Sequence, residues 1–117
     1  MYREEVLDHY KRPRNTGTLE TEFHAEGENP SCGDDTHIYV EVKDGKISKI
    51  RHETDGCAIS TAGISIISEE LKGKEVEEVR DLGEDWMLET LGIDVSPMRK
   101  KCAMLGLKTI QKALEEN

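Results

Sequence analysis

The chain has 117 residues and a formal net charge of −9, a length that suits one domain with one modest hydrophobic core. The acidic balance argues against a nucleic-acid role, because phosphate binding needs a basic face. No apolar run approaches membrane-spanning length, and the N-terminal residues lack the apolar region of a signal peptide. We therefore expect a single domain over residues 1–117, in the cytoplasm, with no nucleic-acid or membrane partner.

The first 35 residues predict one short helix followed mostly by loop. Residues 2–11 have helical spacing, and Pro13 stops the helix. Its expected inner face carries Val6, Leu7 and Tyr10. Residues 12–35 are rich in Gly, Pro, Asn and Asp and predict loop, with a short strand around residues 23–25.

The middle of the chain predicts a β-hairpin. Apolar and polar residues alternate over residues 36–42, as in a half-buried strand. The turn at residues 43–46 contains Asp-Gly, the pair that supplies positive φ angles, and a second strand follows over residues 46–54.

The remainder of the chain predicts helices. Apolar spacing gives helices near residues 57–73, 76–82, 86–91 and 97–114. Gly73 ends the first of these, and Ser96 followed by Pro97 is a strong start for the last. The inner stripe of the last helix is Ala103, Leu107, Ile110 and Leu114. Strands followed by helices predict an α+β fold, in which a small antiparallel sheet of about three strands carries helices on one face.

Three cysteines occur singly, and each is a candidate metal ligand. They are Cys32, Cys57 and Cys102, an odd number that argues against a closed disulfide framework. The first two are flanked by Gly33 and Gly56, which let the backbone turn and a bulky ligand approach. The third follows a basic run ending at Lys101, which favours thiolate over thiol. Accessible thiolates are what soft metals and iron–sulfur clusters require.

The hairpin brings two of these cysteines together. Cys32 precedes its first strand and Cys57 follows its second, so both are expected at one end of the sheet. Cys102 joins them if the last helix docks with its N-terminal end at that edge, where the helix dipole favours thiolate. Asp34 is the best fourth ligand for a tetrahedral site. An oxygen ligand among three thiolates exchanges easily, which suits a site that releases its cargo.

Simpler interpretations of the same residues stay open. A lone cysteine is most often a small buried hydrophobe. Asp34 fits a turn or a cap, and Gly56 fits a turn glycine. The basic run before Cys102 fits a solvated helix face. The coincidence of three suitable settings, rather than any single one, favours a metal site.

The histidines suggest a further alternative. His37 and His52 fall on expected strands, where they are candidate ligands or bases for a cysteine nucleophile. No orienting third residue or oxyanion element accompanies them. His9 and His24 are expected on the surface. A structural zinc protein is the remaining alternative, but the chain lacks the paired C-x-x-C knuckles of such sites.

The motifs resemble the IscU/NifU-N/SufU family of iron–sulfur cluster assembly scaffolds over nearly the whole chain. Residues 2–15 (YREEVLDHYKRPRN) resemble the opening helix of the family and its HYxxPRN stretch. The three cysteine motifs are residues 29–34 (NPSCGD), 56–60 (GCAIS) and 99–105 (RKKCAML), in the family order.

The resemblance implies a SufE/NifU-like fold and a scaffold role. A cysteine desulfurase would deliver persulfide sulfur, a labile [2Fe-2S] cluster would form, and apo-proteins would receive it. Cys32, Cys57 and Cys102 would be cluster ligands and sulfur acceptors. Asp34 would keep the cluster labile or complete a zinc site, and Lys101 would steady the thiolate or sulfide charge.

The sequence departs from both subtypes of the family. IscU-type members carry His before the third cysteine, where this chain has Lys101; SufU-type members tend to have a basic residue there. The chain is too short for the insertion that SufU-type members carry between the second and third cysteines. Residues 95–99 (VSPMR) match poorly the Leu-Pro-Pro-Val-Lys stretch that a dedicated chaperone recognises, which argues against chaperone-driven transfer.

Two functions therefore fit the sequence. The first is a scaffold for [2Fe-2S] assembly, which is a binding and transfer protein rather than an enzyme. The alternative is a zinc-dependent sulfur acceptor of the SufU kind, in which the same four ligands hold zinc and ligand exchange frees a cysteine. The sequence leaves the oligomeric state open.

Overall fold

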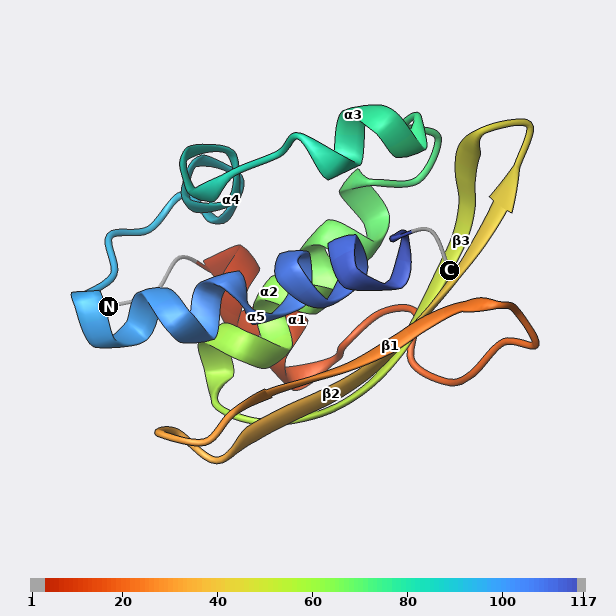
Figure 1. Ribbon diagram of the computed structural model, residues 1–117. Helices are drawn as coiled ribbons and strands as arrows, with labels where there is room; N and C mark the ends of the chain where they lie inside the picture. The colour runs from red at the N-terminus through yellow and green to blue at the C-terminus, as the bar shows by residue number, and fades with distance from the viewer. Residues whose placement is uncertain (1–3, 116–117) are drawn as a thin grey trace.

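The computed structural model describes residues 4–115. The elements in chain order are α1 (Glu4–Lys11), β1 (Phe23–Asn29), β2 (Asp34–Lys43), β3 (Lys46–Asp55), α2 (Ala58–Glu70), α3 (Val76–Arg80), α4 (Glu84–Leu91) and α5 (Pro97–Ala113). The helices lie on one face of a three-stranded antiparallel sheet (Figure 1). The predicted α+β architecture is confirmed. None of the helices in the described range is long and apolar enough to cross a membrane.

The sheet consists of two consecutive hairpins in the order β1-β2-β3. The predicted turn between β2 and β3 is present, with positive φ angles at Asp44 and Gly45. The strand β1 is longer than the sequence predicts, and it pairs with β2 along its whole length from Phe23 to Asn29. The alternation of apolar and polar residues did not indicate the full strand, because Ala25 is the one apolar residue of β1 that is buried. Pairing with β2, rather than its own pattern, therefore makes this segment a strand.

The central element of the molecule is α2, which is buried on all sides. Every residue from 59 to 68 is buried, as expected for a helix enclosed by other elements. It packs against α1, against the sheet through β3, and against α5. The close approach of α5 depends on Gly106, where a methyl group would collide with Ile64. The predicted inner stripe of α5 is buried as expected.

The inner face of α1 differs from the expectation. Val6 and His9 are buried, whereas Leu7 and Tyr10 are 37% and 45% exposed. The prediction that His9 lies on the surface is therefore wrong. His9 turns inward because its Nδ1 lies 2.7 Å from the hydroxyl of Ser65 on α2, which satisfies a polar group that apolar spacing does not reveal.

The buried side chain and the backbone of His52 on β3 form hydrogen bonds with the segment that follows α1. The Nε2–H of His52 donates to the carbonyl of Arg14 over 2.8 Å, and Nδ1 lies 3.0 Å from the Thr54 hydroxyl. The backbone of His52 also bonds to Asn15 and Gly17. These partners suit the neutral ring. Burial lowers the pKa of His52 below its ordinary value of 6.5, although the Arg14 carbonyl opposes this shift.

The free energy of unfolding is expected to fall as the pH drops below about 6.5. His52 then binds a proton more readily in the unfolded chain than in the folded protein. The stabilisation is complete above the unfolded pKa and is lost as the pH falls toward the folded one. Urea unfolding at several values between about pH 7 and pH 5 measures this dependence. The His52→Gln variant should show a shallower pH slope than wild type, although burial also lowers the pKa of His9 and leaves part of the slope. Equal slopes in the two proteins would contradict the assignment.

Candidate metal centre

The loop between β1 and β2, the start of α2 and the N-terminal half of α5 meet at one end of the sheet, at the left of Figure 1, and each of these segments carries one cysteine. Cys32 lies in the loop that joins β1 to β2, and Cys57 directly precedes α2. Cys102 lies in the second turn of α5, whose N-cap is Ser96 as predicted. The helix α5 packs on β1 and β2, which delivers Cys102 to this end.

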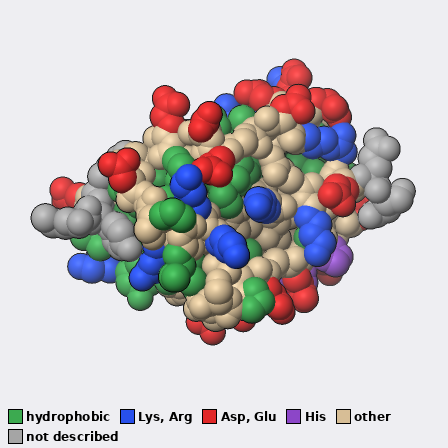
Figure 2. Space-filling model, turned by 60° about the vertical axis from the view of Figure 1, so that its left-hand side comes forward, with side chains coloured by type: hydrophobic (Ala, Val, Ile, Leu, Met, Phe, Trp, Pro, Cys, Tyr) green, Lys and Arg blue, Asp and Glu red, His purple; other side chains and the backbone are tan. Residues whose placement is uncertain are grey.

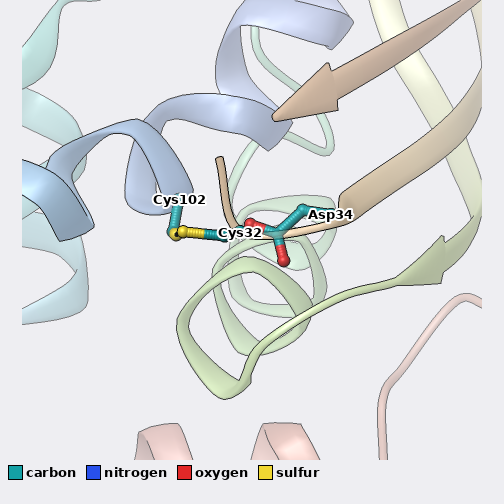
Figure 3. A group of neighbouring side chains, drawn as sticks. All are labelled: Cys32, Asp34 and Cys102. Atoms are coloured by element: carbon teal, nitrogen blue, oxygen red, sulfur yellow. Dashed lines mark hydrogen bonds between the residues drawn. The ribbon is translucent and has the colours of Figure 1, made fainter. Parts of the chain in front are cut away.

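Two thiols and a carboxylate form a compact group. The Sγ atoms of Cys32 and Cys102 lie 3.3 Å apart and point toward one another (Figure 3). An oxygen of Asp34 completes the group, and all three ligand atoms lie within 4.8 Å of one another. Both cysteines are free of disulfides, as is Cys57. Sulfur and oxygen donors at this spacing suit a tetrahedral thiophilic metal or one iron of a cluster.

The carboxylate of Asp34 is the most highly bonded group at the site. It is 2% exposed. Oδ1 accepts the backbone N–H of Cys57 over 2.8 Å, and Oδ2 accepts the Ser60 hydroxyl over 2.8 Å and the Asn29 amide over 3.4 Å. Burial alone would raise the pKa of Asp34, but these hydrogen bonds and that from Cys102 lower it below 3.8. The group is therefore an anion held in place, with lone pairs left for a metal.

Cys57 stands beside the compact group rather than inside it. It is the N-cap residue of α2, with extended backbone angles, and its thiol is half-buried. Its Sγ lies 3.5 Å from the Ser60 hydroxyl. Burial raises the pKa of Cys57, but the N–H and hydroxyl of Ser60 and the thiol of Cys102 outweigh it and lower the pKa below 9.0. The N-terminal end of α2 thus favours a thiolate here.

Cys102 has the opposite environment. It is 1% exposed. Burial, followed by its contacts with Cys32, Asp34 and Cys57, raises its pKa well above 9.0. The side-chain amide of Asn29 lies 3.5 Å from its sulfur. A metal that binds at Cys102 therefore has to displace a proton from a buried thiol.

The two predicted glycines have different roles in the structure. Gly33 has a φ of +71°, which the turn at Cys32 requires and other residues rarely adopt. Gly56 allows a close contact: a Cβ atom there would lie 2.7 Å from Oδ1 of Asp34. The carboxylate can reach the N-terminus of α2 because this side chain is missing.

Lys101 lies near other lysines. Its side chain is exposed, and it lines a groove of about 600 Å³ between β1 and α5 together with Lys108 and Lys112. Glu26 and Glu28 also line this groove. Asn29 lines the same groove, so the groove adjoins the site. Lysine and arginine side chains gather in the middle of the face at this end, with acidic side chains around the margin (Figure 2). The local charge therefore differs from the net charge of −9.

The histidines considered as ligands or bases are engaged elsewhere. His52 bonds to Arg14 and Thr54, and His37 faces His24 and Glu26. A cysteine-nucleophile enzyme with either histidine as base thus gains no support from the geometry.

Two site residues were missed by the sequence analysis. Asn29 and Ser60 both donate to Asp34, and both contact a cysteine. Each lies three residues from a cysteine in the chain, Asn29 before Cys32 and Ser60 after Cys57. This spacing could have indicated a role at the site. It is not specific, because polar residues beside turns and at helix starts often only cap or bond to the backbone.

The fold and this site together define a small α+β domain that gathers thiols and a carboxylate at the edge between sheet and helices. The model of the NifU-like N-terminal domain matches residues 1–117. The chain therefore belongs to this family, which includes the IscU and SufU proteins. It is 36% identical to the iron–sulfur cluster assembly scaffold protein IscU 1 of Archaeoglobus fulgidus, over 97% of this chain and 74% of that protein. It is 30% identical to the zinc-dependent sulfurtransferase SufU of Bacillus subtilis, over 97% of this chain and 89% of that protein.

Solved structures show the same fold. The crystal structure of an iron–sulfur cluster assembly scaffold protein for the SUF system from Fervidobacterium islandicum superposes with a TM-score of 0.84 and 30% identity, and covers 97% of this chain and 96% of that one. A nitrogen-fixing NifU-like N-terminal domain from Brucella abortus superposes with a TM-score of 0.77 at 18% identity, over 96% of this chain and 90% of that one. The second likeness concerns the fold alone.

Replacing Gly56 with Ala is expected to weaken zinc binding about 10- to 100-fold, the range seen when supporting residues of metal sites are changed. The added methyl group pushes the Asp34 carboxylate away from the N-terminus of α2. Competition with a chromophoric chelator measures the affinity. Gly83→Ala is the matched control, because a Cβ atom there meets open space. Equal affinities in the two variants would show that the contact at Gly56 does not matter.

Proposed function

We propose that this protein is a scaffold on which [2Fe-2S] clusters are assembled and from which they are transferred to apo-proteins. The observation that carries the proposal is the compact group of Cys32, Cys102 and Asp34, with Cys57 joined to the same carboxylate through its backbone N–H. Relatives named as scaffolds support it, including the IscU protein of Haemophilus influenzae at 32% identity over 98% of this chain and 94% of that protein.

The role proposed for each cysteine follows from its exposure. Cys32 and Cys57 are half-buried and lie next to turns, so a persulfide on a docked cysteine desulfurase can reach them. A scaffold thiolate attacks the terminal sulfur of that persulfide; a new S–S bond forms, the old one breaks, and the desulfurase thiolate leaves. Cys102 is buried and serves as a ligand from the floor of the site. Lys101, exposed at the rim, adds a positive charge near the thiolates and bridging sulfides of the cargo.

Asp34 acts as the exchangeable ligand. Its oxygens already accept hydrogen bonds from Cys57 and Ser60, so the carboxylate is stable when no iron is bound to it. A carboxylate is also a poorer partner than thiolate for the iron of a cluster. Both effects favour release of the cluster to a recipient protein.

Iron and acid-labile sulfide in protein purified without oxygen test the proposal. We expect equal amounts of iron and sulfide per chain in wild type and their loss in Cys57→Ala, since the variant removes one cluster ligand. Circular dichroism controls for folding of the variant. Zinc without sulfide in wild type, even after incubation with a desulfurase, cysteine and ferrous iron, would reject the scaffold role.

Asp34→Ala is expected to hold its cluster longer than wild type, because the exchangeable ligand is removed. The apo-protein is expected to lose about 1–3 kcal/mol of stability, because the donors on Cys57 and Ser60 lose their acceptor. Decay of the cluster absorbance in the presence of a chelator measures retention. Asp35→Ala is the matched control, because Asp35 is exposed on the opposite face of β2. Cluster loss from Asp34→Ala at the wild-type rate would remove the proposed role of this carboxylate.

The second candidate function is a zinc-dependent sulfur acceptor, favoured by the identity with the B. subtilis SufU protein and by a basic residue, Lys101, before the third cysteine. Cys32, Asp34, Cys57 and Cys102 would hold zinc, and exchange of one ligand would free a cysteine for persulfide. Stimulation of a desulfurase by zinc-loaded protein on which no cluster forms would favour this function over the first.

Both functions require a cysteine desulfurase that docks at the cysteine end of the molecule. Apo iron–sulfur proteins would use the same end as recipients. The basic side chains that gather there, including Lys101 and Lys108, suit a partner surface that carries carboxylates.

A further inference from the structure

The face of the sheet away from the helices carries a second group of metal-ligating side chains. His24 on β1 and His37 on β2 lie diagonally across the two strands, because His37 pairs with Glu26 and His24 pairs with Tyr39. The side chain of His37 is 30% exposed, and His24 is exposed. Residues 34, 36 and 38 of β2 point to the helices, so this group and the cysteine site occupy opposite faces of the sheet.

The two imidazoles are spaced as ligands of one metal ion. His24 Nδ1 lies 3.4 Å from His37 Nε2. Two nitrogens bound at 2.0–2.1 Å to a tetrahedral zinc ion lie about 3.3–3.4 Å apart. A good hydrogen bond between the rings would be shorter, about 2.7–3.2 Å. The observed distance therefore fits the edge of a coordination tetrahedron, as well as a long hydrogen bond between the two rings.

A carboxylate orients the second imidazole. The Nδ1 of His37 lies 3.5 Å from Oε1 of Glu26, which leaves Nε2 as the nitrogen that faces His24. Histidines that bind metals usually donate their other ring N–H to such a group. The ring of His37 also stacks on Tyr39, with centroids 4.5 Å apart and planes 19° apart. Both contacts favour an orientation of the ring in which Nε2 faces His24.

The surroundings attract cations. Beside His37 lies an open hollow of about 360 Å³ whose lining includes the carboxylates of Glu26, Glu28, Asp35 and Glu53. Their summed negative potential raises the local concentration of divalent ions.

We propose that His24 and His37 form an accessory site for a divalent transition-metal ion of the zinc class. The two ring nitrogens are its protein ligands, Glu26 is a positioning residue, and water fills the remaining positions. With only two protein ligands on an open surface, the ion exchanges readily. The site is independent of the function proposed for the cysteines, with which it shares no residue.

Zinc titration of the reduced protein in competition with a chromophoric chelator tests the site. Wild type should bind a weaker equivalent in addition to zinc held by the cysteines, and His24→Gln/His37→Gln should lose only that weaker equivalent. Ring signals of His24 and His37 in ¹H–¹⁵N NMR spectra should shift as the weaker equivalent binds. Cys57→Ala should still bind the weaker zinc equivalent. Loss of zinc at the cysteines and loss of zinc at the histidines can therefore be told apart.

Single substitutions separate ligand and positioning roles. Glu26→Gln should weaken the accessory equivalent about 10- to 100-fold while both imidazole signals still respond to zinc. Glu41→Gln is the matched control: the same charge is removed from a partly exposed position of β2 on the same face of the sheet, and no change is expected. Unchanged zinc binding in His24→Gln/His37→Gln, or imidazole signals of wild type that do not respond to zinc, would overturn the proposal.

Discussion

The buried carboxylate of Asp34 is the interaction on which the cysteine end of the molecule depends. A buried anion is tolerated only when its oxygens are hydrogen-bonded. Here three of the donors come from two segments: Asn29 at the end of β1, and Cys57 and Ser60 at the start of α2. One side chain therefore fixes the β1–β2 loop relative to the N-terminus of α2. The same bonds join the two segments that carry Cys32 and Cys57.

The core supplies the rest of the geometry. α2 is enclosed by α1, the sheet and α5, and the missing side chain at Gly106 lets α5 approach close enough to bring Cys102 over Asp34. A C-x-x-C knuckle takes its shape from the metal, because a short loop has little other reason to hold two thiols together. In this protein the candidate ligands sit on separate elements that pack against one another in the hydrophobic core. Hydrophobic packing therefore contributes to their positions, in addition to any bond to a metal.

Local rules predicted the parts of the structure that depend on neighbouring residues. The Asp-Gly turn indicated the hairpin, and hairpin geometry predicted that Cys32 and Cys57 lie at the same end of the sheet. The position of Cys102 required the packing of α5, which no local pattern specifies. His9 was misplaced for a related reason: its partner Ser65 is 56 residues away, so a polar residue that belongs inside looked like a surface one. Asn29 and Ser60 were missed because their roles exist only once β1 and α2 meet.

The same alternation that builds β2 separates the two chemical faces of the sheet. Even-numbered residues such as Asp34 face the helices, where burial and hydrogen bonds decide the charge state of each ligand. Odd-numbered residues such as His37 face solvent, where water competes for every ligand position. The thiol and carboxylate groups proposed as cluster ligands would bind their cargo in the enclosed setting. The proposed imidazole site would exchange its ion with the solution, so the two faces of one strand would give two sites with different access to water.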